Sequence, residues 1–166
     1  MKYNSIREYF YKLFNILFAL LLLPLLVFVV LYWQIQEGNL VGPFYLDEKI
    51  NQTLIILIGA VVFTDWLISF SLFSKRLKSM KRIQSLGTRL DRYASLTILR
   101  FVLILSGSLV LAVGFCLTEN QIFSIIVVVN MLLLLPLWPF PSKVCRDLQL
   151  KGDERTLVFH KKDRLH

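Results

Sequence analysis

Four long apolar segments separated by polar connections dominate the chain. They cover residues 10–33, 53–73, 94–117 and 122–138. A helix needs about 20 predominantly apolar residues to cross the hydrocarbon core of a bilayer, and each segment is close to that length. The pattern therefore predicts an all-α membrane protein with four transmembrane helices.

The first segment follows basic residues, so a cleaved signal peptide is the alternative to a retained helix. The apolar core of a signal peptide has about 7–15 residues, and this segment is longer. Tyr32, Trp33 and Gln34 stand where small residues would mark a cleavage site. We therefore expect a retained helix, in which Pro24 is tolerated as prolines are in other membrane spans.

Lysine and arginine are concentrated in the connection between the second and third segments. In the connections at 34–52 and 118–121 the only lysine or arginine is Lys49. Short basic connections remain on the cytoplasmic side of a membrane. The pattern predicts two antiparallel helical hairpins in the cell membrane (inner or plasma), with both termini in the cytoplasm. The basic connection contains Lys75, Arg76, Lys78, Lys81, Arg82, Arg89 and Arg92.

The net charge of +8 raises the question of a nucleic-acid partner. The basic residues adjoin apolar segments, where positive charge sets topology and attracts anionic lipid headgroups. We therefore expect membrane lipids as partners and no nucleic acid. Apolar residues alternate with the basic ones over residues 75–92, which predicts a continuation of the second helix that breaks near Gly87. A docking site for an acidic partner is the alternative use of this surface.

The chain is predicted to divide into a transmembrane domain (1–141) and a short cytoplasmic tail (142–166). Within the tail, the apolar stretches at 144–150 and 156–160 flank Lys151-Gly152-Asp153-Glu154. A glycine-containing turn between two such stretches indicates a small β-hairpin. A disordered tail is the alternative.

Among the polar residues inside the predicted spans, three stand out, because ionisable and amide groups are costly there and usually face protein. Asp65 and Arg100 lie on consecutive antiparallel segments and are predicted at similar depth, which suggests an ion pair. Two alternatives remain open: Arg100 extends to the headgroups without a partner, or Asp65 is a proton or cation site. Asn130, near the middle of the fourth segment, is expected to hydrogen-bond across a helix interface.

Small residues and an internal similarity bear on how the segments pack. Gly107 and Gly114 are seven residues apart in the third segment, and this spacing indicates a close-packing face. Asn51-Gln52 and Asn120-Gln121 open the second and fourth segments. This similarity is either a repeat of two hairpins or a coincidence.

The sequence carries no recognisable catalytic, metal-binding or cofactor-binding motif, so we predict neither a metal nor a cofactor. Cys116 and Cys145 are predicted on opposite sides of the bilayer and so cannot pair within the chain. The leading hypothesis is a non-enzymatic accessory or assembly subunit, with a membrane protein or another copy of itself as partner. The alternative is a small oligomeric transporter or channel that uses Asp65, Arg100 and Asn130. An enzyme acting on lipids is a third possibility.

Overall fold

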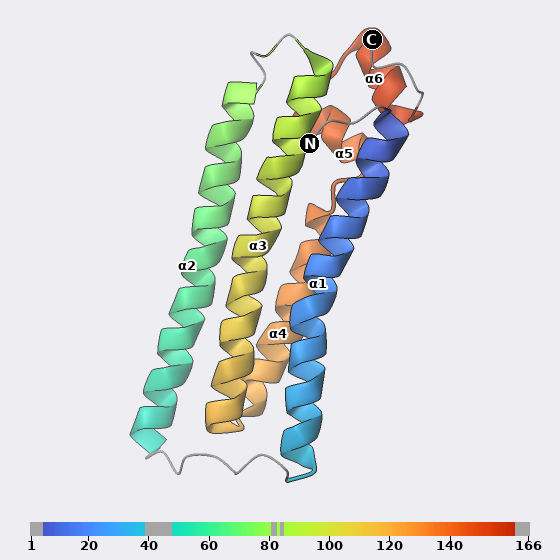
Figure 1. Cartoon of the computed structure of the whole chain (residues 1–166). Coiled ribbons are helices and arrows are strands. Elements are labelled where there is room, and N and C mark those ends of the chain that lie inside the picture. The colour runs from blue at the N-terminus through green and yellow to red at the C-terminus, as the bar shows by residue number, and fades with distance from the viewer. Residues whose placement is uncertain (1–4, 39–47, 81–82, 84, 162–166) are drawn as a thin grey trace.

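A computed structural model describes residues 5–38, 48–80, 83 and 85–161 of the chain (Figure 1). Every regular element in these ranges is a helix. The elements are α1 (Ile6–Gln36), α2 (Glu48–Met80), α3 (Leu86–Thr118), α4 (Gln121–Leu134), the 3-10 helix η1 (Leu135–Leu137), α5 (Pro141–Asp147) and α6 (Gly152–Phe159).

Three of these helices, α1, α2 and α3, are long and apolar enough to cross a membrane. A fourth span is present if α4 with η1 and α5 are counted together, although they are bent by 72° relative to each other. Each of the first three predicted apolar segments falls within a helix, and the fourth falls within α4 and η1 except for its last residue, Trp138. The sequence pattern thus agrees with three to four membrane-spanning helices, which is the arrangement of a multi-pass membrane protein.

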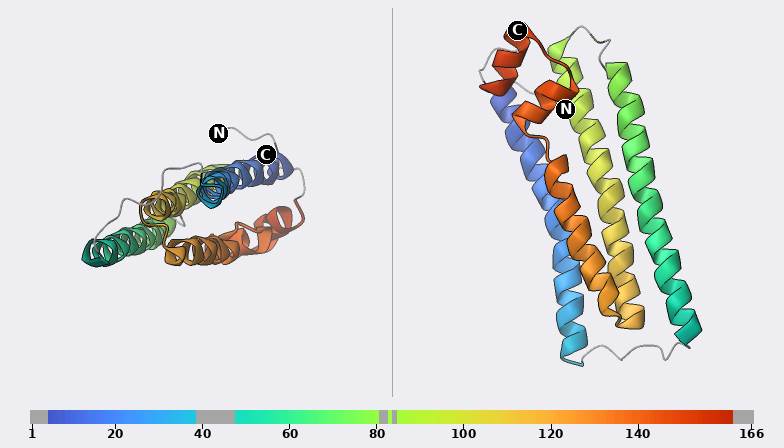
Figure 2. Two further views of the ribbon diagram at one scale, coloured as in Figure 1. Left: turned by 90° about the horizontal axis from the view of Figure 1, so that it is seen from below. Right: turned by 180° about the vertical axis from the view of Figure 1, so that it is seen from behind.

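Helix α3 is the centre of the bundle and packs against α1, α2 and α4. Figures 1 and 2 show α5 and α6 at the end of the bundle where α1 begins. We call this end, formed by α5, α6 and the neighbouring turns of α1 and α3, the tail end. The opposite end, where α3 meets α4, is called the loop end.

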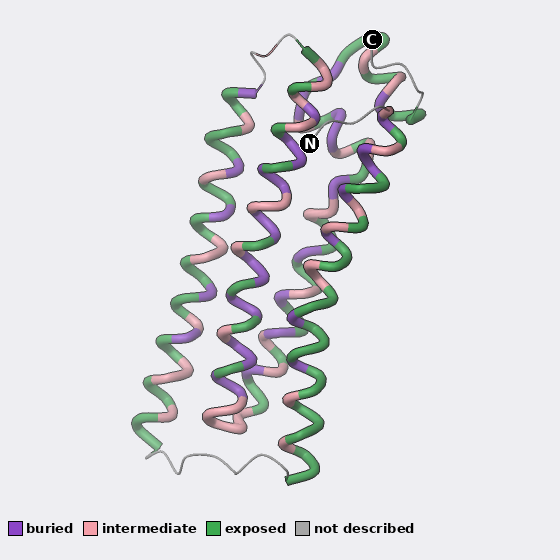
Figure 3. Tube along the Cα trace, in the orientation of Figure 1, coloured by how far each residue is buried: buried purple, intermediate pink, exposed green. Residues whose placement is uncertain are grey.

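The buried apolar residues form two clusters, one near each end. The tail-end cluster joins Ile6 and Tyr9 of α1 to Leu90 of α3 and to Val144 and Val158 of α5 and α6. The loop-end cluster consists of Phe28, Ile58, Val62, Leu111, Ala112, Phe115, Phe123 and Val127. Figure 3 shows buried positions along much of α3, whereas α2 and the loop-end part of α1 are largely exposed.

Helices α3 and α4 are joined by a two-residue turn. Glu119 adopts a left-handed conformation (φ 51°), and its backbone N–H donates to the Phe115 carbonyl at 2.7 Å. Asn120 is the N-cap of α4, because its side-chain oxygen accepts the Ile122 N–H at 3.0 Å. By contrast, Asn51 lies inside the first turns of α2. The two asparagines that suggested a repeat therefore have different structural roles.

The prediction of a β-hairpin in the tail is wrong, because 144–150 and 156–160 fall largely in α5 and α6. Pro141 stands in the first turn of α5, where proline's fixed φ favours a helix. Val144 and Leu148 are buried four residues apart, which is helical spacing. Alternation of apolar and polar residues concealed this spacing at the level of sequence.

The basic connection between the second and third segments is mostly helical. Helix α2 continues to Met80, as predicted, but the break precedes Leu86 rather than occurring near Gly87, which lies inside α3. Lys81 and Arg82 lie outside the described residues. Both α2 and α3 therefore extend beyond the apolar segments that located them.

Candidate functional site

Asn130 connects three helices at the level where the two buried clusters meet. Its side-chain oxygen accepts the Trp66 Nε1–H of α2 at 2.7 Å. Its amide nitrogen donates to the Ser108 hydroxyl of α3 at 2.7 Å and to the Ile104 carbonyl at 3.3 Å. Asn130 is 2% exposed. Its side chain therefore forms buried hydrogen bonds between helices, as expected from the sequence.

Arg100 is buried at the tail-end half of the bundle and lies between aromatic rings of α2. Its Cζ atom is 4.2 Å from the centroid of the Phe70 ring and 4.5 Å from that of Phe73. These distances fit cation–π contacts, which favour a desolvated guanidinium. The Tyr93 hydroxyl of α3 donates to the Asp147 carboxylate of α5 at 2.9 Å. No ion pair joins Arg100 to a carboxylate within the described residues, so the two aromatic rings are the contacts that stabilise the buried cation.

Asp65 stands one residue beyond the midpoint of α2 and is half-buried. It faces α3, since a Cβ atom at Gly107 would lie 3.4 Å from Asp65 Oδ2. In the ranges that the structure describes, no hydrogen bond or ion pair reaches this carboxylate. A carboxylate in the middle of a span is costly without a partner. Asp65 is therefore a candidate for contact with a group outside the described residues of this chain.

The predicted Asp65–Arg100 ion pair is absent from the described part of the chain, and the reason is helix register. Asp65 lies opposite Gly107, which is seven residues along α3 from Arg100. At 1.5 Å per residue this separates the two groups by about 10 Å along the axis. The prediction assumed that α2 and α3 end at the same level. Met80, the last residue of α2, instead borders a cavity with Arg92 and Leu96, so α3 extends past α2.

Gly107 and Gly114 lie on the α3 face that packs against α2, as the small-residue pattern predicted. A Cβ atom at Gly114 would lie 2.7 Å from Ile58 Cδ1 and 2.9 Å from Phe123 Cε1. These contacts are too short to tolerate a side chain without rearrangement. Glycine therefore allows α2, α3 and α4 to approach each other closely at the loop end.

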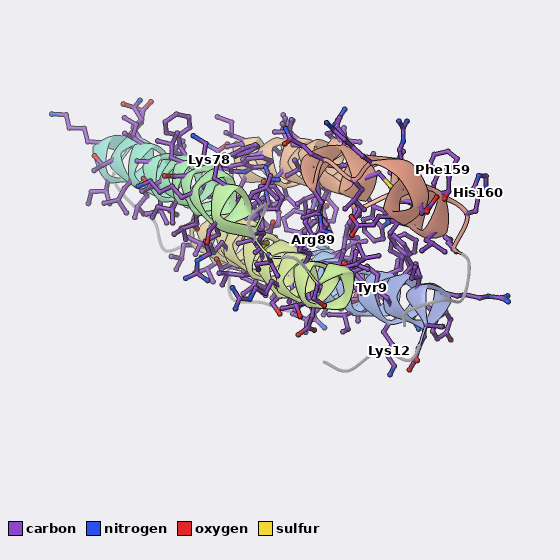
Figure 4. All side chains as sticks on the ribbon, turned by 90° about the horizontal axis from the view of Figure 1, so that it is seen from above. Tyr9, Lys12, Lys78, Arg89, Phe159 and His160 are labelled. Carbon is purple, nitrogen blue, oxygen red and sulfur yellow. The ribbon has the colours of Figure 1, made fainter. Side chains whose placement is uncertain are left out.

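The basic residues predicted to contact lipid headgroups divide into two groups. Lys75, Arg76, Lys78 and Arg92 are exposed near the tail end. Arg89 is different, because its guanidinium donates to both carboxylate oxygens of Glu154 in α6, at 2.6 and 2.7 Å. Figure 4 shows Arg89 in the interior of the tail end. Arg89 therefore anchors α6 to α3.

Sequence reasoning overlooked the tail as a structured part of the molecule. Cys145 is a free thiol of α5, and Cys116 is a free thiol near the loop end of α3.

Comparison of the chain with known protein families, curated protein sequences and solved structures finds no match.

Proposed function

We propose that this chain is a non-enzymatic subunit of a complex in the cell membrane, and that it binds its partner through the Asp65 face of α2. The observation that carries the proposal is the Asp65 carboxylate, which is half-buried and without a polar partner in the described ranges. A second membrane helix with a cationic group at the same depth would complete it.

The shape of the bundle supports this proposal. Helix α2 packs against α3 at one edge of the bundle and leaves Val61 and Ile68 exposed, one turn before and one turn after Asp65 on the same side of the helix. An apolar surface with one polar group at its border with α3 suits an interhelical contact that is specific in depth and rotation. The basic residues at the tail end support a cytoplasmic location for this end, because positive charge is retained there.

The alternative of a small oligomeric transporter or channel receives less support. Its three polar residues do not converge: Asn130 and Arg100 are occupied by side chains of the same chain. Asp65 lies about 10 Å from Arg100 along α3 by residue spacing. A solute path would therefore have to rest on Asp65 and a second copy of the chain.

The test is co-purification from the native membrane in a mild detergent. The wild-type chain is expected to retain a stoichiometric membrane protein, and Asp65→Asn should release it, since the substitution removes the charge but keeps the shape. Thr64→Val is the matched control: the exposed Thr64 hydroxyl donates to the Ala60 carbonyl of its own helix at 2.6 Å. This variant should keep the partner.

Two results would overturn the proposal. One is a wild-type chain that purifies without any other protein and moves a solute across liposomes, with flux abolished in Asp65→Asn. That result would establish the transporter alternative. The other is release of the partner by Thr64→Val to the same extent as by Asp65→Asn, which would show that the carboxylate has no specific part in the contact.

A further inference from the structure

A basic cavity lies between α5 and α6 at the tail end. Its volume is about 870 Å³, within the range of about 300–1,000 Å³ typical of small-molecule sites. Four of its lining residues are cationic, and the lining residues that the structure describes include no acidic one. The cationic residues are Lys143, Arg146, Lys151 and Arg155.

Two acidic residues of the tail, Asp147 and Glu154, contact side chains of α3 and do not line this cavity. Asp147 accepts the hydrogen bond of the Tyr93 hydroxyl at 2.9 Å. Both carboxylate oxygens of Glu154 accept from one guanidinium nitrogen, Nη2, of Arg89. Arg146 Nε lies 3.9 Å from Asp147 Oδ1, at the outer limit of an ion pair, and its side chain is 78% exposed. The cavity therefore retains a strong positive charge.

The cavity also has an apolar wall. Phe140 and Phe159 line it and are exposed, and Pro136 and Leu150 lie beside them. Figure 4 shows Phe159 at the outer rim of the tail end. A surface that combines exposed aromatic rings with cations is typical of the membrane–water interface.

The bend after η1 gives the cavity its position relative to the spans. Helix α5 turns by 72° from the axis of α4 and η1, at the point where the fourth apolar segment ends. Lys143 Nζ donates to the Pro136 carbonyl at 2.7 Å, which satisfies a carbonyl that the end of the helix leaves without an intrahelical partner. If α4 and η1 span the bilayer, this bend places the cavity at the level where acyl chains give way to headgroups.

We propose that this cavity binds one anionic phospholipid per chain. Arg146 and Arg155 contact the phosphate, for which the planar guanidinium is well suited. Phe140 and Phe159 pack against the glycerol backbone and the first methylene groups. The site is separate from the Asp65 face of α2, so the lipid-binding proposal does not depend on the proposed subunit role.

The experiment uses the purified full-length chain in a neutral detergent. Short-chain phosphatidylglycerol, short-chain phosphatidylcholine and inorganic phosphate are titrated separately, and thermal unfolding is followed by tryptophan fluorescence. Phosphatidylglycerol is expected to raise the unfolding temperature saturably, and phosphatidylcholine is not. Arg146→Gln with Arg155→Gln should weaken phosphatidylglycerol binding by roughly tenfold or more, because charge-assisted hydrogen bonds are lost.

The matched control removes two positive charges from the same end of the molecule but outside the cavity. Arg7→Gln with Lys12→Gln on α1 is suitable, since Figure 4 shows Lys12 on the opposite side of the tail end from Phe159. Its affinity for phosphatidylglycerol should stay within about twofold of the wild type. Equal weakening in the two double variants would overturn the proposal in favour of general surface charge.

A further variant covers the case in which the arginine pair fails to fold. Phe140→Ser keeps every charge and removes part of the apolar wall, so it should weaken the binding of phosphatidylglycerol. Unchanged affinity in Phe140→Ser would overturn the lipid assignment. Stabilisation by inorganic phosphate at the same concentrations as phosphatidylglycerol would likewise overturn it, and would assign a site for a free anion.

Discussion

The two ends of the bundle are held together in different ways. At the tail end, α5 and α6 cover α1 and α3 with a large apolar cluster, and the Arg89–Glu154 and Tyr93–Asp147 contacts border it. At the loop end the cluster is smaller, and Gly114 of α3 leaves no room for a side chain beside Ile58 and Phe123. One end relies on burial of side chains and the other on close approach of helices.

This difference fits the solvent that each part would meet if the apolar helices span a bilayer. Outside the bilayer, the folded state is stabilised when apolar side chains are removed from water. Inside the bilayer the lipid is as apolar as leucine, so helices associate through close packing and interhelical hydrogen bonds. In that arrangement the glycines of α3 and the Asn130 contacts would be of the second kind, and the buried residues of α5 and α6 would be of the first.

Leu148→Ala is expected to have the largest effect, because it opens a cavity in the tail-end cluster. Leu148 is 2% exposed, and such truncations cost about 2–5 kcal/mol. The expected result is a loss of about 3 kcal/mol in the free energy of unfolding. Faster tryptic cleavage after Lys151 and Arg155 should accompany it as α5 and α6 detach.

The control for this change is Leu135→Ala in η1, where the leucine is 58% exposed. We expect little change in stability or in cleavage for this variant. If Leu148→Ala and Leu135→Ala behaved alike, the tail would not be docked on the bundle, and the contrast between the two ends would disappear.

Gly114→Ala should have the next largest effect, at the loop end. The added methyl group meets Ile58 Cδ1 and Phe123 Cε1 at distances below 3.0 Å. Overpacking of this kind costs about 1–3 kcal/mol. The free energy of unfolding in mixed micelles is expected to fall by about 2 kcal/mol.

Gly59→Ala in α2 is the matched control, because nothing lies within 4 Å of its added Cβ atom. It should be neutral or slightly stabilising, since alanine is the better helix former. A Gly114→Ala variant as stable as Gly59→Ala would mean that α2, α3 and α4 are not in close contact at the loop end.

Asn130→Leu tests the junction between the two ends and should have the smallest effect. The change leaves the Trp66 Nε1–H and the Ser108 hydroxyl without their Asn130 partner. Interhelical hydrogen bonds in membranes are worth about 1 kcal/mol, and a loss of this size is expected, with a shift in Trp66 fluorescence. Asn15→Leu, at an exposed position of α1, should cause no loss. Equal stability of the two variants would contradict the role assigned to Asn130.

The helices of this fold could be predicted from sequence, whereas their register could not. Apolar segment length identifies α1 to α4, because the requirement to cross the bilayer is local and strong. The relative level of Asp65 and Arg100 depends on how far α3 extends past α2, and no local pattern encodes this. The tail helices were missed for a related reason: the burial of Val144 and Leu148 depends on contact with distant parts of the chain.

For the candidate site, too, the role of a residue could be predicted from sequence, whereas its partners could not. Asn130 could be assigned an interhelical role because a buried amide needs partners wherever they lie. Its partners, Trp66 and Ser108, could not be named, since they come from two other helices. Likewise, the charges of Lys143 and Arg155 are visible in the sequence, but the fold of α5 and α6 alone brings them around one cavity.

The two-residue turn at Glu119 and Asn120 has a consequence for the biogenesis of the protein. So short a link prevents α4 from entering the membrane independently of α3, so the two helices are expected to insert as one unit. Contacts that are close in sequence form with little loss of chain entropy, which favours early pairing of Ser108 with Asn130. Trp66, which is 64 residues from Asn130, would join afterwards. The order of synthesis and the order of assembly would then differ, with α2 made before α4 but secured after it.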